Sequence, residues 1–420
     1  MDRTTGFLNE DLERKSWDEQ RDVQARRLGE VVVYAAANAP AIRDLLRAAG
    51  MLPGDIRSLE DLARLPVTPK AKLVEMQRVN PPFGGLLAVP LHQVRRVFRS
   101  PGPIYDPQGF DEGWGWEEAL FAAGFRRGDL CINTFGYQMT PAGMMFDDAL
   151  GALGCPLVPT GVGDRDVQVE ILRALGITGF VGMASFLLQI GERAKEQGLD
   201  PAKDFGLKVA FTTAEPLPDG LRNSVEALFG ATVRQGFGTA DCGCLAYECH
   251  ARGGMHLVGR AIVEIADPET GRPLGPGEVG EVVVTLLNRA YPLIRFGTGD
   301  LSAVDHGVCA CGRKSPKLRG WLGRCDQLVK VKGMFLHPGT VQTAMRAFPE
   351  VIRFRALVTR TENHDVLTVQ TESTAQNDAL KARIEAHLRE TLCLGAEVEW
   401  AAAGAIPADG KVIEDLRKWD

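Results

Sequence analysis

The sequence has no long apolar segment, and this absence excludes two classes of protein. Its longest apolar runs, such as GALGCPLVP at residues 151–159, have the length of a buried strand and are too short to span a membrane. The first residues, MDRTTGFLNEDLERKSWDEQRD, are charged and contain no apolar core of a secretory signal. We therefore expect a cytoplasmic protein without a membrane partner.

A strong net charge is also missing, and so is a disulfide pattern. The formal net charge is −6 and the pI is about 5.8, so the chain has no general attraction for nucleic acid. Its nine cysteines are odd in number and are not expected to pair in the cytoplasm. Five of them form two groups, Cys242, Cys244 and Cys249 and then Cys309 and Cys311; the other four are expected to be buried small apolar side chains.

The stretch VFRSPGPIYDPQGF at residues 97–110 lacks the lysine and the threonines of a phosphate-binding loop. Pro101 and Pro103 stiffen it and remove two backbone N–H donors. One interpretation is a rigid turn with solvated arginines. We favour the other, in which the Ser100 hydroxyl, the Gly102 N–H and the guanidinium groups nearby bind phosphate; these groups belong to Arg95, Arg96 and Arg99.

The order of the expected elements predicts an α/β protein of two or three domains. Residues 10–78 have helical periodicity, and short apolar strands then alternate with helices, which predicts parallel strands with crossover helices. The chain ends in a β-α-β-β-α-β order, typical of a small α+β module. We expect an N-terminal domain over 1–325 (helical start 10–78, α/β core about 95–255, β-rich part about 256–322) and a C-terminal domain over 326–420.

Two predicted strands end in residues that suit a nucleotide. YPLIRFGTGDL at 291–301 has glycines that release the backbone at the strand exit and present Asp300, whose carboxylate suits a ribose diol. VAFTTAEPLPDG at 209–220 ends its strand in Ala214, Glu215 and Pro216. Each motif alone is also compatible with an ordinary turn at the end of a strand.

A third strand end, VRQGFGTADCG at 233–243, combines glycines with a carboxylate. Gly236 and Gly238 lack side chains, which would permit a flat ligand to approach the backbone closely. Asp241 follows them and offers an oxygen to a hard cation such as Mg²⁺.

Taken in order, these motifs resemble those of the adenylate-forming enzymes, and most closely the phenylacetate–CoA ligase family. The resemblance also covers LPVTPK at 65–70, which matches the family's LP-x-T-x-K signature, and CACGR at 309–313. It continues through GRCDQLVKVKGMFLHP at 323–338 and AIPADGKVIEDLRKW at 405–419, so it spans nearly the whole chain.

The resemblance implies a fold, a reaction and a set of ligands. The fold is that of the adenylate-forming enzymes: a large multi-part N-terminal α/β domain with a β-rich subdomain, and a small, mobile α+β C-terminal domain. A carboxylate attacks the α-phosphate of ATP to give an acyl-AMP and pyrophosphate, and the thiol of coenzyme A then displaces AMP. ATP, AMP, Mg²⁺, coenzyme A and a small carboxylic acid are the implied ligands, and a homodimer is the implied assembly.

The resemblance also implies roles for individual residues. Asp241 stands where the family usually has a Mg²⁺-binding Glu, Arg324 follows its hinge-region pattern, and Asp326 would be the pivot between half-reactions. Lys411 would be the catalytic lysine that bridges phosphate and carboxylate, although a solvated surface lysine is the alternative. The implied nucleotide-binding residues are Ala214, Glu215, Pro216, Gly236, Phe237, Gly238, Thr239, Asp300 and Ser100.

The acyl pocket is expected from two stretches, NTFGYQMTPAG at 133–143 and GMASFLL at 182–188. Their aromatic and Met side chains favour a small aromatic, branched or hydroxy acid over a long fatty chain, although the same side chains would also suit a core. The candidate lining residues are Tyr137, Ala142, Gly143, Ala184 and Ser185, with Met139 and Met183 beside them.

A zinc site is predicted from two loops. Cys249 and His256 in one loop, with Cys309 and Cys311 in the other, supply three thiolates and an imidazole, which suit a closed, structural tetrahedral site. Cys244 is the second choice among the competing ligands Cys242, Cys244 and His250. The alternative is a set of unpaired core cysteines.

Two other functions stay open at this stage. The chain could adenylate an acid and pass it to an amine or to a carrier-protein thiol. It could also be a catalytically idle relative that binds a nucleotide or an acyl-CoA, which the altered 97–110 stretch and Asp241 favour. The presence of Asp300, Arg324 and Lys411 argues against an idle protein.

Overall fold

The structure, a computed structural model, describes most of the chain and divides into two compact units. The described residues are 2–100, 104–110, 112–325, 329–331, 334–336, 338–361, 364–392, 394–407 and 411–417. Unit 1 consists of Met1–Thr298 and Ala303–Gly320, and unit 2 of Gly299–Ser302 and Trp321–Asp420. The predicted domain boundary after residue 325 stays a prediction.

Unit 1 begins with helices that pack their apolar faces into its main core. Ser16 caps the amino terminus of helix α2, because its hydroxyl accepts the N–H of Glu19 while the Glu19 carboxylate accepts the N–H of Ser16. Its buried face includes Leu28 and Val32. The helices are α1 (Glu10–Glu13), α2 (Trp17–Asn38), α3 (Pro40–Ala48) and α4 (Lys70–Val79), with single 3₁₀ turns at Pro53–Asp55, Glu60–Arg64 and Leu91–Gln93.

A parallel sheet forms the centre of unit 1 and confirms the predicted α/β class. Its strands follow the order β5-β4-β6-β7-β8 and all run parallel. The strands are β4 (Cys131–Asn133), β5 (Leu157–Val158), β6 (Gly179–Gly182), β7 (Val209–Thr212) and β8 (Thr232–Thr239). The helices around them are α5 (Trp116–Ala123), α6 (Ala142–Ala152), α7 (Arg165–Leu175), α8 (Ala184–Glu196), α9 (Pro201–Asp204) and α10 (Asp219–Phe229).

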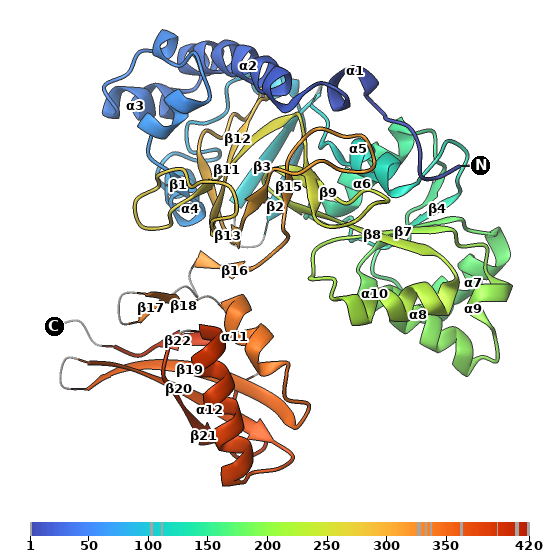
Figure 1. Cartoon of the computed structure of the whole chain (residues 1–420). Helices are drawn as coiled ribbons and strands as arrows, with labels where there is room; N and C mark the ends of the chain where they lie inside the picture. The colour runs from blue at the N-terminus through green and yellow to red at the C-terminus, as the bar shows by residue number, and fades with distance from the viewer. Residues whose placement is uncertain are drawn as a thin grey trace. The chain divides into compact units, whose positions relative to one another are not determined.

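Helices cover both faces of this sheet because its strands are apolar on both faces. Phe180 and Ala210 belong to one buried cluster, with residues of α7, α8 and α10, whereas their neighbours Val181 and Phe211 belong to another, with residues of α5 and α6. Figure 1 shows α5 and α6 above strands β7 and β8, with α8 and α10 below them.

Antiparallel strands extend unit 1 beyond the parallel ones. Strands β9 (Gly243–Tyr247), β10 (Met255–Leu257), β14 (Val304–Asp305) and β15 (Lys317–Leu318) continue the first sheet from β8. A second sheet has the order β1-β13-β12-β11, formed by β1 (Thr68–Pro69), β11 (Ala261–Ala266), β12 (Gly280–Leu286) and β13 (Phe296–Ser302). Strands β2 (Val94–Ser100) and β3 (Ile104–Gly109) form a separate antiparallel hairpin.

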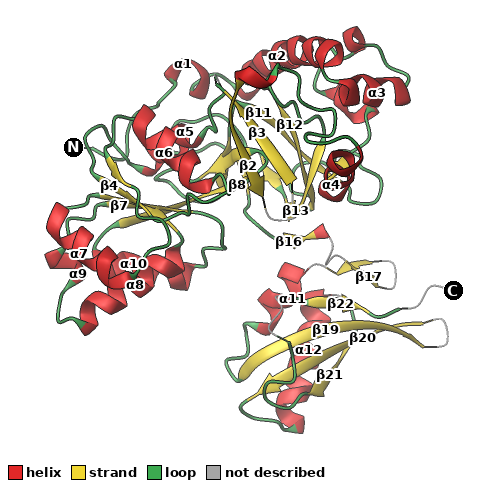
Figure 2. Ribbon diagram, turned by 180° about the vertical axis from the view of Figure 1, so that it is seen from behind, coloured by secondary structure: helices red, strands yellow, loops and turns green. Residues whose placement is uncertain are grey.

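Unit 2 is the small α+β module that the sequence predicts. Its sheet has the order β21-β20-β19-β22, and α12 packs against it through Leu380, Ile384 and Leu388 (Figure 2). Its elements are β16 (Gly323–Arg324), β17 (Val329–Val331), β18 (Met334–Leu336), α11 (Pro338–Met345), β19 (Val351–Thr361), β20 (His364–Ser373), α12 (Asp378–Leu392), β21 (Ala396–Trp400) and β22 (Ile413–Asp415). Across the described residues, no helix has both the length and the apolar character needed to cross a membrane.

Candidate functional site

The residues predicted for the acyl pocket follow strands β4 and β6, which are neighbours in the sheet. At this point the order in which the chain adds strands to the sheet changes direction. The chain leaves β4 toward β5 at the edge and then returns to β6 on the other side of β4. In open α/β sheets, ligands bind outside the carboxyl ends of the strands at such a switch point. Tyr137 and Gly143 follow β4, and Ala184 and Ser185 follow β6, so the topology brings the two predicted stretches to the same place.

Side-chain contacts fix the segment after β4. The Asn133 amide donates to the Tyr137 hydroxyl (2.9 Å) and to the Gly143 carbonyl (2.9 Å), and Tyr137 in turn donates to Asp147 (3.3 Å). A Cβ atom on Gly143 would lie 2.6 Å from the Gly136 carbonyl, so only glycine fits there. Burial, followed by the charge of Asp147, raises the pKa of Tyr137, which therefore stays a neutral hydroxyl.

A predicted nucleotide residue contacts a predicted pocket residue. The Glu215 carboxylate, which follows β7, accepts bonds from the Ser185 N–H (2.7 Å) and the Ser185 hydroxyl (2.8 Å) in the first turn of α8. A carboxylate is stabilised there because the helix amino terminus carries partial positive charge. Ala214 has a positive φ of 72°, an uncommon backbone for alanine that turns the chain at the end of β7.

Glycine is required at both ends of the GFG stretch, but not for the reason predicted, which was the close approach of a flat ligand. A Cβ atom on Gly236 would lie 2.6 Å from the Phe211 ring, and one on Gly238 would lie 2.3 Å from the Gly243 carbonyl. The Trp116 ring fills the space beside both glycines. On this side, protein side chains and backbone lie against the glycines, so their small size does not by itself indicate a flat ligand.

Asp241 has a partner that the sequence analysis missed. Its carboxylate oxygen Oδ2 lies 2.7 Å from the Lys70 ammonium, and its side chain is 0% exposed. Its other oxygen, Oδ1, is buried and has no hydrogen-bond partner. The signal that could have identified Lys70 is the LPVTPK stretch, in which it is the last residue.

The surroundings of Asp241 do not fit a protein-held Mg²⁺ ion. Mg²⁺ requires six oxygen ligands in near-octahedral geometry and usually keeps several waters. Asp241 lines a cavity of about 20 Å³, which holds one water molecule at most, and Arg260 lines the same cavity. Asp106 and Glu112 line the cavity too, so its small volume and the ion pair with Lys70, not its charge, disfavour a protein-held Mg²⁺ ion.

Asp300 lies within strand β13, and this corrects its predicted place at the strand exit. Strand β13 continues to Ser302 because Asp300 pairs with Arg324 and Leu301 pairs with Gly323 on β16. The Asp300 oxygen Oδ1 accepts bonds from Trp321 Nε1 (3.1 Å) and Arg324 (3.2 Å). The predicted pair Asp300 and Arg324 is therefore brought together.

Lys411 lies two residues before β22 and is exposed. The backbone after it is fixed, because the Val412 carbonyl accepts the N–H of Ala356 on β19 (2.9 Å). The predicted pivot Asp326 and the side chain of Ser100 lie outside the described residues.

Two of the three arginines assigned to the 97–110 stretch have another partner. Arg95 and Arg96 form ion pairs with Asp148 of α6, at 3.2 Å and 2.6 Å. Gln108 on β3 donates to the same carboxylate (3.3 Å). These contacts tie the hairpin to α6, so the interpretation of Arg95 and Arg96 as phosphate ligands loses support.

The predicted zinc ligands are brought together. One ligand atom from each of Cys249, His256, Cys309 and Cys311 lies within 4.8 Å of the others, and this is the only group of its kind found among the described residues. The His256 Nδ1 atom lies 3.1 Å from the Ser315 carbonyl, so Nδ1–H donates there and Nε2 faces the cluster. The hydrogen bond from Cys249 lowers the pKa of Cys311, which favours a thiolate.

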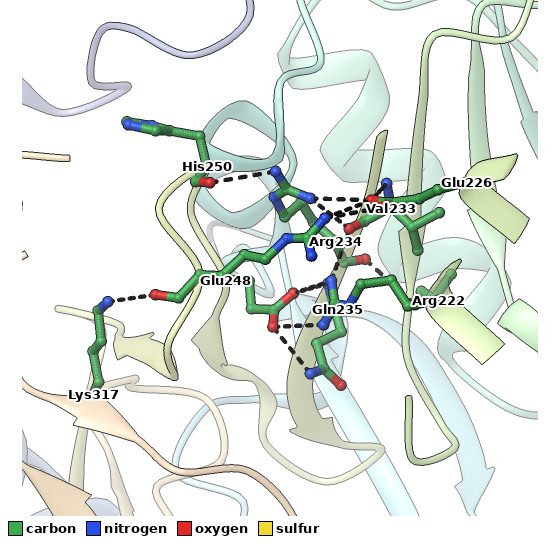
Figure 3. A network of polar contacts seen from close by, with 10 residues as sticks. Arg222, Glu226, Val233, Arg234, Gln235, Glu248, His250 and Lys317 are labelled. Atoms are coloured by element: carbon green, nitrogen blue, oxygen red, sulfur yellow. Dashed lines mark hydrogen bonds and ion pairs between the residues drawn. The ribbon is translucent and has the colours of Figure 1, made fainter. Parts of the chain in front are cut away.

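A buried polar network supports the loop that carries Cys249. The Glu248 carboxylate accepts two bonds from Arg222 (2.8 and 2.9 Å) and one from the Gln235 amide (3.1 Å). Figure 3 shows Arg222 and Gln235 converging on Glu248, with Lys317 donating to a backbone carbonyl further along the loop. Because Glu248 precedes Cys249, these bonds position the first ligand of the cluster before any metal is bound.

Replacing Glu118 by glutamine is expected to stabilise the protein at pH 8. Burial, followed by the charge of Glu13, raises the pKa of Glu118 to about 7, although it accepts the Tyr247 hydroxyl. The folded-state pKa lies above the ordinary 4.5, so the wild-type protein loses stability as the pH rises through this interval, by up to about 3 kcal/mol. Glutamine keeps an oxygen for Tyr247 and does not ionise. Urea unfolding at pH 5 and pH 8 measures the difference, and an equal effect at both pH values would contradict the prediction.

Comparisons with known proteins agree with this geometry. Residues 149–286 match the family described as AMP-binding enzyme, and residues 333–415 match the AMP-binding enzyme C-terminal domain. The chain is 32% identical to a phenylacetate–coenzyme A ligase of Thermus thermophilus over 365 residues, which cover 84% of this chain and 81% of that protein. It is 31% identical to a phenylacetate–coenzyme A ligase of Aromatoleum evansii, over 86% of this chain and 84% of that protein.

Solved structures give the same result. An open conformation of 2-hydroxyisobutyryl-CoA ligase, in complex with 2-HIB-AMP and CoA, matches with a TM-score of 0.84 at 26% identity, over 96% of this chain and 93% of that chain. The same ligase in the postadenylation state with 2-HIB-AMP has a TM-score of 0.79, over 96% of this chain and 91% of that chain.

Proposed function

This chain belongs to the phenylacetate–coenzyme A ligase family, and from that premise we propose that it adenylates a small carboxylic acid and transfers the acyl group to coenzyme A. The predictions of the family, of the fold class and of an AMP-forming acid–coenzyme A ligase are confirmed by the matches in sequence and structure. The acid and the roles of individual residues are proposals.

The contact between Glu215 and Ser185 is the observation that carries the proposal. It joins the loop predicted to line adenine with the helix start predicted to line the acid, at the switch point of the parallel sheet. The attack of the acid on ATP requires the two substrates to be held side by side, because orientation removes much of the entropic barrier. A single loop that reaches both predicted subsites supports this juxtaposition.

We assign two charged residues to the nucleotide and to the reaction. Asp300 accepts hydrogen bonds from the ribose hydroxyls, and its contacts with Trp321 and Arg324 orient the carboxylate. Lys411 supplies a positive charge where charge accumulates on the α-phosphate and the attacking carboxylate. The pyrophosphate leaves with the electron pair of the broken P–O bond, and the thiol of coenzyme A then displaces AMP.

The substrate is proposed to be a small aromatic or branched acid. The similar proteins include ligases of phenylacetate, an aromatic acid, and of 2-hydroxyisobutyrate, a branched hydroxy acid. The exposed apolar side chains Met139 and Met183 flank the predicted pocket segments and suit either kind of apolar substituent.

An ATP–pyrophosphate exchange assay tests the proposed function. Purified protein is incubated with ATP, labelled pyrophosphate and one acid at a time, with phenylacetate, 2-hydroxyisobutyrate and a long-chain fatty acid as the first three. We expect exchange with at least one small acid and none with the fatty acid. Formation of the acyl-CoA after addition of coenzyme A, against an amine or a carrier-protein thiol, identifies the acceptor. Absence of exchange with every small acid would refute the proposal.

A structural zinc ion is part of the proposal. Three thiols and one imidazole nitrogen within 4.8 Å fit a closed tetrahedral site, and the contact of His256 with Ser315 sets the required tautomer. His256, predicted in a loop, lies in strand β10, so bound zinc would cross-link the loop after β9 and strand β10 to the loop after β14. Mg²⁺ is proposed to arrive with ATP and to be held by its phosphates.

The assembly and the cellular location remain predictions. A homodimer is implied by the family resemblance, and a cytoplasmic location by the composition of the chain. Light scattering coupled to size-exclusion chromatography at several protein concentrations would measure the assembly.

Replacing Asp300 by alanine is expected to raise the KM for ATP by about 10–100-fold. Each hydrogen bond between a charged group and a hydroxyl contributes about 1.5–3 kcal/mol, and about 1.4 kcal/mol corresponds to a factor of ten. The KM for the acid should change much less. Steady-state exchange kinetics with both substrates varied separate the two effects, and an unchanged KM for ATP would remove Asp300 from the ribose site.

A further inference from the structure

The ion pair between Lys70 and Asp241 is a feature that the roles assigned above do not explain. It joins the first residue of α4 to the turn between β8 and β9, across 171 positions of sequence. Asp241 follows the predicted nucleotide strand directly, so Lys70 lies at the edge of the predicted nucleotide site. Neither the sequence motifs nor the proposed mechanism gives Lys70 a task.

The two members of the Lys70–Asp241 ion pair differ in solvent exposure. The Asp241 side chain is 0% exposed, whereas that of Lys70 is 29% exposed. A ligand that approaches from solvent therefore meets the ammonium before the carboxylate. The cavity that Asp241 lines has room for a single water molecule, too little for a hydrated metal ion.

Helix α4 is fastened to the hairpin that was predicted to bind phosphate. The Gln77 side chain donates to the Tyr105 carbonyl (2.8 Å) and accepts the Tyr105 N–H (2.8 Å), which joins the helix to β3. On the other side, the Thr68 N–H donates to the Arg295 carbonyl (2.8 Å), which fixes the backbone just before Lys70. Helix α4 is thus tied to the hairpin through Gln77 near its carboxyl end, and Lys70 at its first position contacts Asp241 in the turn after β8.

The local charges favour an anion next to Lys70. A lysine at the first position of a helix is disfavoured by the partial positive charge there, and α4 has no acidic residue in its first turn. The same helix end attracts an anion through its unpaired N–H groups. In the hairpin, Arg95 and Arg96 are paired with Asp148 and residues 94–109 include no lysine, so a phosphate group at this edge would meet the ammonium of Lys70 together with the exposed Arg99.

We propose that Lys70 binds the pyrophosphate part of ATP, and that Asp241 is the positioning residue that holds the Lys70 ammonium, not a magnesium ligand. This inference rests on the proposed function, because it names a further binding residue of the same site. The Lys70 ammonium forms charge-assisted hydrogen bonds to the β- and γ-phosphate oxygens.

Calorimetric titration with inorganic pyrophosphate tests the role of Lys70 without requiring catalysis. Lys70→Ala is expected to raise the Kd for pyrophosphate by about 10–100-fold, the contribution of one or two hydrogen bonds between charged groups. Lys70→Arg keeps the charge and should recover part of the affinity. Lys72→Ala is the matched control, because Lys72 is an exposed lysine of the same helix, and it should bind as the wild type does.

A second variant guards against misfolding. Lys70→Ala leaves the buried Asp241 carboxylate without its partner, which is strongly destabilising. The double variant Lys70→Ala with Asp241→Asn removes both charges and is expected to fold, as judged by circular dichroism and thermal unfolding. It should show the same loss of pyrophosphate affinity. Wild-type affinity in this folded double variant would overturn the proposal.

A double-mutant cycle distinguishes whether Asp241 positions Lys70 or binds a magnesium ion. Asp241→Asn alone should raise the Kd for pyrophosphate about tenfold, because the ammonium loses its fixed position. In the Lys70→Ala background the same change should have no further effect, since Asp241 acts through Lys70. A magnesium ligand would behave differently: Asp241→Asn would raise the Mg²⁺ concentration needed for half-maximal exchange, with pyrophosphate affinity unchanged, and that result would also overturn the proposal.

The two proposals can fail separately. If no acid supports exchange by the wild-type protein, the proposed ligase reaction is refuted. The role of Lys70 in pyrophosphate binding is still tested separately by calorimetric titration. If exchange is active and the KM for ATP is unchanged by Lys70→Ala, the inference about Lys70 fails alone.

Discussion

Replacing Lys411 by alanine is expected to lower the rate of ATP–pyrophosphate exchange by about 10²–10³-fold. Removal of one preorganised charge or donor from a site where charge develops has an effect of this size in other enzymes. Lys411 is exposed and belongs to no helix or strand. Its replacement should therefore leave the unfolding temperature nearly unchanged. Lys411→Arg should retain part of the rate, because the positive charge remains.

Lys381→Ala is the matched control for this experiment. Lys381 is a partly exposed lysine on α12 of the same unit, and its contact with Glu385 is a surface ion pair at 4.0 Å. Its removal should leave exchange unchanged. If Lys411→Ala releases pyrophosphate at nearly the wild-type rate, Lys411 is a solvated surface lysine and the catalytic assignment is wrong.

Removal of zinc is expected to destabilise the protein by more than about 4 kcal/mol. Loss of a structural metal is one of the few changes that reach this size, because the binding free energy of the metal is also folding free energy. Purified protein should contain one zinc ion per chain by elemental analysis. Cys309→Ser should lower both the zinc content and the unfolding temperature, and a strong chelator should do the same to the wild type.

Cys244→Ala is the informative control, because Cys244 was the competing ligand. In the structure Cys244 is fully buried, and the sulfur atom lies 3.9 Å from the Ala246 carbonyl, outside the four-residue cluster. This variant should keep its zinc. Zinc-free protein, together with full stability of Cys309→Ser, would eliminate the metal site.

Several parts of the protein could be predicted because the signal is local. Alternating strands and helices predicted the parallel sheet, since periodicity and length are set by neighbouring residues. The four residues predicted to bind zinc from residue type and spacing lie together in the structure, although the competing Cys242 and Cys244 lie only a few positions away in sequence. Here the chemistry restricts the choice, because few side chains offer a thiolate or an imidazole.

Other features depend on residues far apart in the chain, and no local pattern contains them. Gly236 and Gly238 were interpreted as space for a ligand, whereas Trp116, more than a hundred positions earlier, packs against both. Asp300 was placed at a strand exit, but pairing with Arg324 on β16 extends the strand past it. In both cases the partner is chosen by packing and strand pairing, which the sequence of the motif itself does not record.

By itself, the sequence determined the family, the fold class and the kinds of chemical group that this protein places at the ends of its strands. These follow from local periodicity and from the reactive atoms that each residue type carries. Only the tertiary structure decided which groups meet: Glu215 with Ser185, Asp148 with the arginines of the hairpin, and Asp241 with Lys70. The reason is physical. A buried charge is tolerated only with a partner, and the fold, not the neighbouring sequence, supplies that partner.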